Sequence, residues 1–438
     1  MQMRNRALYE AMRGCCEAAI TKLAERYRDL HALPATYLKQ VKVGRTGSCT
    51  WSRVETVDWI EVVDSNAQLL KSLKEYAEAT EAMRSDAKFS RHLSKLVGTS
   101  ESKGRIDEDI VLRHILIALF QEQNALTFKE SVFARLYAIT EDYFYSDQLE
   151  YMAFAPLPGF KTDVEVIPLE ETMSITQVSN EKMEEWLATP VFAMTADTQE
   201  LLASRYVLTL RMRVAKLLGD ENSETSLPPG PTGIAREKFS HVLSALRLFK
   251  KGHVGFRDIF LEGPTGDLFG GRSSVHLTAV RNLTFADYSL VGSEVAKFVR
   301  FWKAYQDARQ AIQSPIERAL RRLEASYNRW TSEDRLLDFV IAFEVLFRTT
   351  NKHTAAFRAA ALIGGNLEDL KRTYTIVKAA YGIRHSIVHE GAANEMPKLG
   401  EERITLSALV DKTEEILRKA IRVDMRLESC TSLSAMKC

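Results

Sequence analysis

Hydrophobic positions in the first third of the chain recur at helical spacing. In "NRALYEAMRGCCEAAITKLAERYRDL" the apolar side chains fall four or seven residues apart, at Leu8, Met12, Ala19 and Leu23, which is typical of one face of an amphipathic helix. "EDIVLRHILIALFQEQ" is apolar around most of its circumference and predicts a buried helix. Residues 1–150 are therefore predicted to form an N-terminal helical region.

The pattern changes at "FAPLPGF", where two prolines and a glycine exclude a continuing helix. "VEVIPL" and "MSITQV" predict short strands, and "SNEKMEEWLA" predicts a capped helix start. "RYVLTLRMRVAK" alternates apolar and polar residues, as a half-buried strand does. A loop at 227–233, a helix in "REKFSHVLSALRLF" and further strands follow. Residues 151–295 are thus predicted to be a mixed α+β region of unknown role, which we interpret as a sensor or scaffold.

Residues 296–438 show the strongest helical pattern. "SPIERALRRLEASYNRW" predicts a helix with Ser314 as its N-cap and an apolar stripe that reaches Trp330. Four more helices are predicted in "TSEDRLLDFVIAFEVLF", "TAAFRAAALI", "LEDLKRTYTIVKAAYGIRHSIVHEG" and "ERITLSALVDKTEEILRKAIRVDMRL". Short connections join them, which favours a bundle. The predicted fold class is α+β: a mostly helical chain with a mixed middle region and a C-terminal all-α bundle.

Composition excludes some classes of protein. The 438 residues are 45% hydrophobic and 27% charged, as in ordinary globular proteins. A net charge of +1 argues against a uniformly basic nucleic-acid coat and leaves a local patch open. The five cysteines have neither disulfide-framework nor zinc-site spacing. No signal peptide and no apolar run of ~18 residues is apparent, so we expect a cytoplasmic protein without membrane association.

The stretch "YGIRHSIVHEG" carries the candidate chemistry, because it places Arg384, His385 and His389 in an otherwise apolar helical segment. A lone histidine on such a helix is more often a core residue, and an arginine there is often paired with a carboxylate such as Glu344 or Glu390. His385 and His389 are four residues apart, hence on one helical face, as two zinc ligands would be. No third ligand stands out, so neither a metal nor another cofactor is predicted.

The alternative is phosphate chemistry. A guanidinium such as that of Arg384 suits the paired oxygens of a phosphate, and an imidazole can accept or donate a proton near neutral pH. Together they could catalyse attack of an RNA 2′-hydroxyl on the neighbouring phosphate. On an ideal helix, however, Arg384 and His389 lie about 140° apart. Either the helix distorts before Gly391, or a second copy of the chain completes the site in a dimer.

These residues resemble a known motif. "RHSIVH" is similar to the R-x4-6-H motif of the HEPN superfamily (higher eukaryotes and prokaryotes nucleotide-binding). The flanking stretches "LLDFVIAFEVLF", "FRAAALIGG" and "VKAAYGIRHSIVHEG" resemble the Apea-like HEPN group, although "VHEG" stands here where "VHG" is commoner. The resemblance covers roughly residues 150–425 and is most specific in the last 125 residues or so.

The resemblance implies a dimeric all-α bundle, and many HEPN members are metal-independent endoribonucleases that act as toxins or in defence against phage. By position, Arg384 and His389 would be the catalytic pair, and His385 would support them. Tyr381 and Glu344 are further supporting candidates. Their structural alternatives are core packing for Tyr381 and a salt bridge between helices for Glu344.

Arginines on the helix at 314–330 form a second candidate feature. Arg318, Arg322 and Arg329 are predicted to project on one face, away from the apolar stripe. Such a row could follow an RNA backbone. The alternative is a solvated face whose charges pair with side chains on the same helix.

The sequence therefore predicts a metal-independent HEPN endoribonuclease, homodimeric, that cuts RNA as a toxin or anti-phage effector under an unknown trigger or inhibitor. The alternative is a non-catalytic HEPN module for dimerisation or nucleotide binding, in which the upstream region recognises a partner or ligand.

Overall fold

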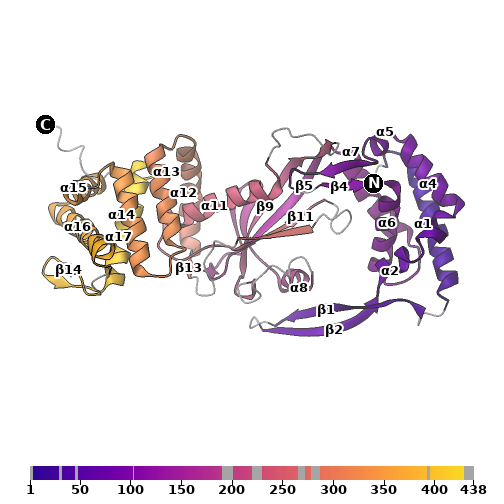
Figure 1. The fold of residues 1–438 in the computed structure, drawn as a ribbon, viewed down its shortest axis with the longest axis horizontal. Coiled ribbons are helices and arrows are strands. Elements are labelled where there is room, and N and C mark those ends of the chain that lie inside the picture. The colour runs from indigo at the N-terminus through magenta and orange to yellow at the C-terminus, as the bar shows by residue number, and fades with distance from the viewer. Residues whose placement is uncertain are drawn as a thin grey trace.

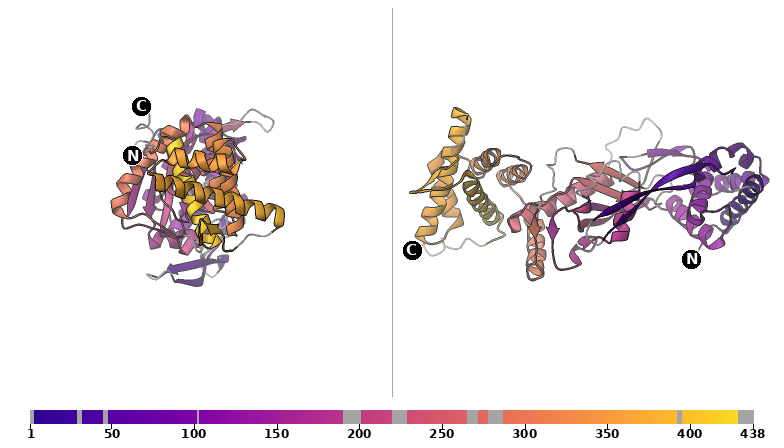
Figure 2. Two further views of the ribbon diagram at one scale, coloured as in Figure 1. Left: turned by 90° about the vertical axis from the view of Figure 1, so that its left-hand side faces the viewer. Right: turned by 90° about the horizontal axis from the view of Figure 1, so that it is seen from below.

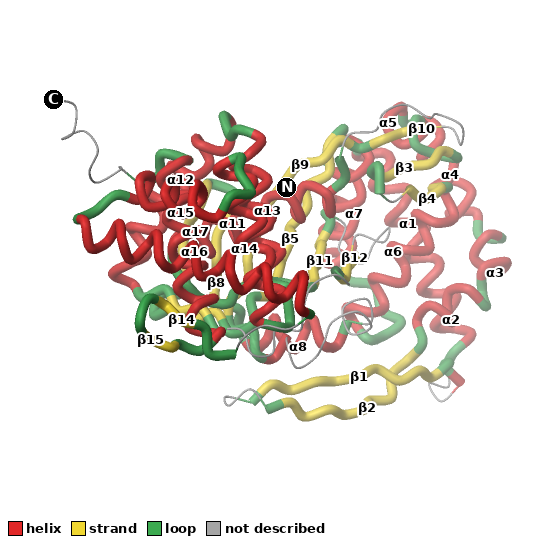
Figure 3. Tube along the Cα trace, turned by 60° about the vertical axis from the view of Figure 1, so that its left-hand side comes forward, coloured by secondary structure: helices red, strands yellow, loops and turns green. Residues whose placement is uncertain are grey.

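The computed structural model describes residues 3–28, 32–44, 48–101, 103–189, 201–219, 229–264, 272–277, 287–391 and 395–428. The molecule is elongated, with N-terminal helices at one end, a sheet in the middle and the C-terminal helices at the other end (Figure 1). Figure 3 shows the same order, with the strands of the sheet between two groups of helices. This confirms the predicted α+β class. Among the described residues, no helix is both long and apolar enough to cross a membrane.

The N-terminal region packs around its own hydrophobic core. That core contains Leu8, Met12 and Leu23 as predicted, together with most of the apolar residues of "EDIVLRHILIALFQEQ". Phe89 and Phe144 stack inside it with their ring centroids 4.0 Å apart. The helices are α1 (Arg6–Arg26), α2 (Trp59–Asp64), α3 (Ala67–Lys71), α4 (Lys74–Ser85), α5 (Ala87–Ser90), α6 (Glu108–Gln123) and α7 (Glu130–Tyr145).

The prediction that residues 1–150 are helical is incomplete, because two antiparallel hairpins lie among these helices. They are β1 (Ala35–Val43) with β2 (Cys49–Val57), and β3 (Lys95–Gly98) with β4 (Lys103–Ile106). The β1–β2 hairpin reaches from the N-terminal helices to α8 (Asn180–Ala188) of the middle region (Figure 1). There the backbone N–H of Val43 donates a hydrogen bond of 2.8 Å to Glu184 Oε1.

A six-stranded antiparallel sheet forms the middle region, in the order β12-β11-β5-β9-β8-β7. In β9, Leu208, Leu210, Met212 and Val214 are buried while both arginines are exposed, so the predicted alternation is confirmed. The strands are β5 (Gln148–Pro156), β7 (Val166–Glu170), β8 (Met173–Gln177), β9 (Tyr206–Ala215), β11 (Asp258–Glu262) and β12 (Arg272–His276). The short strands β6 (Phe160–Lys161) and β13 (Tyr288–Ser289) pair beside it, and β10 (Leu217–Gly219) joins β3.

Helix α11 (Pro231–Phe249) connects the sheet to the C-terminal helices. It contacts β5, β9 and β11, and it also contacts helices of the bundle. The loop predicted at 227–233 is therefore shorter than expected, because the helix begins at Pro231, where a proline fits the first helical turn. Residues 227 and 228 of that loop lie outside the described residues.

The C-terminal bundle consists of α12 (Gly292–Gln310), α13 (Ser314–Ser326), α14 (Ser332–Phe347), α15 (Lys352–Ile363), α16 (Leu367–Glu390) and α17 (Leu406–Asp424), with a small hairpin of β14 (Lys398–Leu399) and β15 (Glu402–Arg403). Figure 2 (left) shows it from its outer end. The predicted helices are confirmed. Two details of the first are wrong: Gln313 is the N-cap rather than Ser314, and because α13 ends at Ser326, Trp330 is 70% exposed.

The bundle and the sheet share one hydrophobic core, which continues from β5 to the end of α17. The boundary predicted at residue 296 falls inside α12, and the residues on its two sides pack together in this one core. The N-terminal region, by contrast, has a core of its own.

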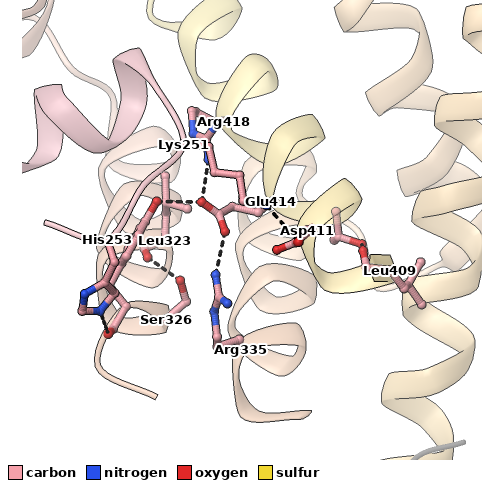
Figure 4. A network of polar contacts seen from close by, with 11 residues as sticks. Lys251, His253, Leu323, Ser326, Arg335, Leu409, Asp411, Glu414 and Arg418 are labelled. Carbon is pink, nitrogen blue, oxygen red and sulfur yellow. Dashed lines mark hydrogen bonds and ion pairs between the residues drawn. The ribbon is translucent and has the colours of Figure 1, made fainter. Parts of the chain in front are cut away.

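A buried carboxylate joins three helices of the bundle (Figure 4). The Glu414 side chain on α17 is 1% exposed. It accepts hydrogen bonds from the Tyr327 hydroxyl (2.6 Å), from Arg335 on α14 (2.6 Å) and from Arg418 one turn further along α17 (2.5 Å). Because both carboxylate oxygens are neutralised and hydrogen-bonded, the charge is tolerated away from water.

The same network extends to α11 and the segment after it. The Arg247 guanidinium lies 4.4 Å from the centroid of the Tyr327 ring and donates to the carbonyl oxygen of Val254 at 2.7 and 3.1 Å. Lys251 and Asp411 form an ion pair of 2.9 Å beside it (Figure 4). Polar contacts therefore tie the helix on the sheet to α13 and α17.

Glu414→Ala is expected to destabilise the protein by about 3 kcal/mol, because it leaves the buried Arg418 and the half-buried Arg335 without their carboxylate. Urea unfolding followed by circular dichroism measures this loss. The matched control is Glu415→Ala, which removes an exposed carboxylate from the same helix and should leave the unfolding midpoint close to the parent value. Equal midpoints for the two variants would contradict the role of the network.

Candidate functional site

Helix α16 carries the predicted site. Its start is fixed by a capping box: Asn366 accepts from the Asp369 backbone N–H (3.0 Å), and Asp369 accepts from the Asn366 backbone N–H (3.3 Å). Its end is fixed by Gly391, whose φ of 75° is left-handed and suits glycine. The helix predicted to finish near Gly391 is thus confirmed.

Burial along α16 ends just before the candidate residues. Val377, Ala380, Tyr381 and Ile383 are buried in the shared core, whereas the residues after Ile383 are half-buried or exposed. Arg384 is half-buried, and His385 and His389 are exposed. The last two turns therefore present the motif to solvent at the end of the bundle.

The two histidines lie side by side. Their ring centroids are 4.4 Å apart at an interplanar angle of 46°, as the spacing of four residues predicts. Throughout the described ranges, no group of three His, Cys, Asp or Glu side chains is arranged to hold a metal ion. The pair is thus an exposed imidazole couple on one helical face.

Arg384 is free for a ligand. Within the part of the chain that the structure describes, its guanidinium forms no hydrogen bond and no ion pair, so the alternative of a salt bridge to Glu344 or Glu390 is not formed. The helix stays α-helical through Glu390, so distortion before Gly391 does not bring Arg384 and His389 to one face. Distortion of the helix is therefore not observed, and completion of the site by a second copy stays a prediction.

Tyr381 and Glu344 meet where α14 and α16 pack. Burial raises the pKa of the Tyr381 phenol, the Glu344 carboxylate raises it further, and the Arg384 guanidinium lowers it. Tyr381 is 5% exposed, and its hydroxyl has no hydrogen-bond partner among the described residues. Glu344 is half-buried. The Tyr381 phenol thus senses the charges of both Glu344 and Arg384, and its hydroxyl is unpaired within the described residues.

The predicted arginine row on α13 is mostly engaged in structure. Arg322 Nη1 and Arg329 Nε each bind the buried carboxylate of Asp338 on α14, at 3.2 and 2.7 Å. Arg318 is exposed and reaches only the Ser314 carbonyl oxygen of its own helix, at 3.4 Å. Two of the three arginines therefore join α14 to the α13 segment, and the RNA-binding role stays a prediction.

The sequence reasoning missed two features that the structure brings together. Glu414 was not singled out, although it stands on the apolar face defined by Val410, Leu417 and Ile421, where a charge signals a buried partner. The β1–β2 hairpin was also missed. Its signal was present as two runs rich in Val, Thr, Tyr and Trp, "TYLKQVKV" and "CTWSRVETV", on either side of glycine-containing turn residues.

Comparison with known proteins adds no assignment. No protein-family model, no curated protein and no solved structure matches the chain significantly. The candidate site therefore stands on its own geometry.

Arg329→Gln is expected to lower the free energy of unfolding by about 1 kcal/mol, because it removes one charged partner of the buried Asp338 while its own exposure limits the loss. Arg318→Gln should leave the unfolding midpoint near the parent value. Urea unfolding of both variants measures this difference. If instead both variants are as stable as the parent and bind RNA more weakly to the same extent, the arginines form an RNA-contacting row.

Proposed function

We propose that the protein is a metal-independent endoribonuclease of the HEPN type, which acts in the cytoplasm as a toxin or anti-phage effector. One observation carries the proposal: Arg384, which has no hydrogen bond or ion pair among the described residues, shares the last turns of α16 with two exposed histidines. A cation that has no structural partner, next to groups that can move protons, fits a phosphate ligand.

In the proposed reaction, the Arg384 guanidinium binds the non-bridging oxygens of the scissile phosphate and stabilises the charge that builds on them. The His389 imidazole accepts the proton of the ribose 2′-hydroxyl. The 2′-oxygen forms a bond to phosphorus, and the bond from phosphorus to the 5′-oxygen breaks. The leaving 5′-oxygen takes a proton from a second imidazole, so the products are a 2′,3′-cyclic phosphate and a 5′-hydroxyl end.

A homodimer completes the site in this proposal, and His385 beside the reacting His389 is the second imidazole. Because α16 is regular and Arg384 and His389 face about 140° apart, one copy cannot direct both at a single phosphate from one helical face. Two copies related by a two-fold axis would bring the arginine of one against the histidine of the other. His385 then lies beside the reacting imidazole at 4.4 Å between ring centroids. The charges of Glu344 and Arg384 both act on the Tyr381 phenol beneath this turn of the helix.

The alternative, a non-catalytic HEPN module with upstream ligand recognition, has one observation in its favour. A cavity of about 470 Å³ lies between the N-terminal region and the sheet, and it is lined by Arg105, His114, Tyr151, Thr232 and Leu261 among others. A pocket of this size and mixed polarity suits a small ligand. In the nuclease proposal the same cavity is a place for the trigger that controls cleavage.

Arg384→Ala and His389→Ala are each expected to slow RNA cleavage at least about 100-fold, because each removes a group that acts on the reacting phosphate or ribose. Cleavage of total RNA and of purified tRNA is measured on gels with a chelator present, and the new ends are analysed for cyclic phosphate.

The matched controls are Arg372→Ala, an exposed arginine on the same helix, and His353→Ala, an exposed histidine on α15. Both should cleave at the parent rate. If Arg384→Ala and His389→Ala cleave as fast as the parent protein, the site assignment is wrong. If they change only stability or dimerisation, the alternative function is supported.

Mixing the two inactive variants is expected to restore activity. Random pairing makes half of the dimers mixed, and each mixed dimer keeps one arginine opposite one histidine, so about a quarter of the parent activity should return. The variants are unfolded and refolded together, and the rate is compared with that of each variant alone. A mixture no more active than its components would place the pair within one copy and contradict the composite site.

A further inference from the structure

The β1–β2 hairpin lies far from α16, toward the other end of the molecule (Figures 1 and 2). It is a two-stranded sheet on its own, and most of the residues along both strands are exposed. The end of the hairpin next to its turn contacts α8. Val41 is buried in a small cluster with Trp186, and Val43 is hydrogen-bonded to Glu184. The hairpin is therefore an exposed ribbon whose position is fixed by the middle region.

One face of this ribbon combines two cations with two aromatic rings. The register places Lys39 directly opposite Arg53. Lys39 Nζ lies 3.6 Å from the centroid of the Trp51 ring, and Arg53 Cζ lies 3.9 Å from the centroid of the Tyr37 ring. We call these four residues the basic-aromatic face. Tyr37 is 51% exposed and Trp51 is 39% exposed, so solvent reaches both rings.

The charges on this face are not neutralised by the protein. Neither Lys39 nor Arg53 forms an ion pair in the described ranges, although Glu55 stands on the same face, opposite Tyr37. Two like charges directly opposite each other destabilise a sheet. By sequence, residues 35–57 hold four basic residues and one acidic residue, a local charge of 4 − 1 = +3 in a chain of net charge +1. The ribbon is thus a local basic patch in a nearly neutral protein.

Stacking on the rings offsets only part of that repulsion, because an exposed cation–π contact stabilises by about 0.5–1 kcal/mol. A bound polyanion would neutralise the remaining repulsion between Lys39 and Arg53. Phosphates spaced along a nucleic-acid strand would neutralise both cations, and every base has a flat face that stacks on tryptophan or tyrosine. An acidic peptide would neutralise the two cations and leave the two aromatic rings without a stacking partner. The combination of cations and rings on one face therefore favours a nucleic acid.

We propose that the basic-aromatic face binds single-stranded RNA, with Lys39 and Arg53 on phosphates and Trp51 and Tyr37 stacked on bases. The choice of RNA over DNA rests on the proposed function, in which the ribbon recruits the RNA that α16 cuts. Binding by the ribbon itself does not require cleavage. The contact with α8 fixes the position of the ribbon before RNA binds, which lowers the entropic cost of binding.

The test uses the full-length chain carrying His389→Ala, so that the RNA stays intact, and a fluorescein-labelled unstructured oligouridine RNA. Fluorescence anisotropy gives the dissociation constant over a series of salt concentrations. Arg53→Gln should weaken binding several-fold and lower the slope of log affinity against log salt by about 0.7, the value for one phosphate contact on a single strand. Trp51→Ala should weaken binding by about fivefold to 100-fold through lost base stacking.

Lys42→Gln is the matched control. It removes the same charge from the same hairpin but from the opposite face, and Lys42 is exposed like Arg53. It should bind within twofold of the parent, and thermal unfolding should show that all variants are folded. Equal losses for Arg53→Gln and Lys42→Gln would mean that binding follows net charge alone and would overturn the proposal. RNA affinity unchanged in Arg53→Gln and Trp51→Ala would also overturn it, as expected if the face binds a protein instead.

The outcome is separate from that of the nuclease proposal. Loss of binding in the ribbon variants, with equal cleavage by the parent protein, Arg384→Ala and His389→Ala, would leave an RNA-binding ribbon and refute the site on α16. Cleavage that depends on Arg384 and His389, with unchanged RNA affinity in the ribbon variants, would refute the ribbon and leave the enzyme.

Discussion

The buried carboxylate of Glu414 is the interaction on which the arrangement of the C-terminal half depends. It accepts hydrogen bonds from Tyr327, Arg335 and Arg418. The Tyr327 ring in turn contacts Arg247 on α11, the helix that covers the sheet. Removing one partner from such a group leaves an uncompensated charge away from water, which costs several kcal/mol. The helices that carry these residues therefore cannot shift separately, and the bundle is fixed against the sheet through the same contacts.

This fixed arrangement determines which side chains of α16 are exposed to solvent. Helix α16 packs against α14, α15 and α17, and its buried face ends at Ile383. In the two turns beyond that point only Ile387 still packs against the core, and His385 and His389 are exposed, so the motif is open to a ligand. Several charged groups in the bundle are paired and hold helices together, as Asp338 does with Arg322 and Arg329. The contrast between these paired arginines and Arg384 supports a phosphate site on α16.

Much of the fold followed from the periodicity of the chain. The long helices of the bundle and strand β9 have regular apolar spacing, because each buries one face in a core, and the sequence located them correctly. The β1–β2 hairpin was missed because most of its positions are exposed. Neither of its faces is consistently apolar, so the sequence does not distinguish a core face from a solvent face. Trp330 was misplaced for the opposite reason, since its apolar character suggested a core position beyond the real end of α13.

The sequence by itself determined which segments become helices and strands, where α16 ends, and which residue types stand on its last turns. Only the tertiary structure decided which charges find partners. Glu414 binds side chains that are 79 and 87 residues away along the chain. Asp338 binds two of the three arginines that the sequence suggested for RNA, whereas Arg384 has no ion pair or hydrogen bond within the described residues. The physical reason is that hydrophobic periodicity specifies the face of an element that is buried, while the partner of a polar side chain depends on which other elements pack beside it.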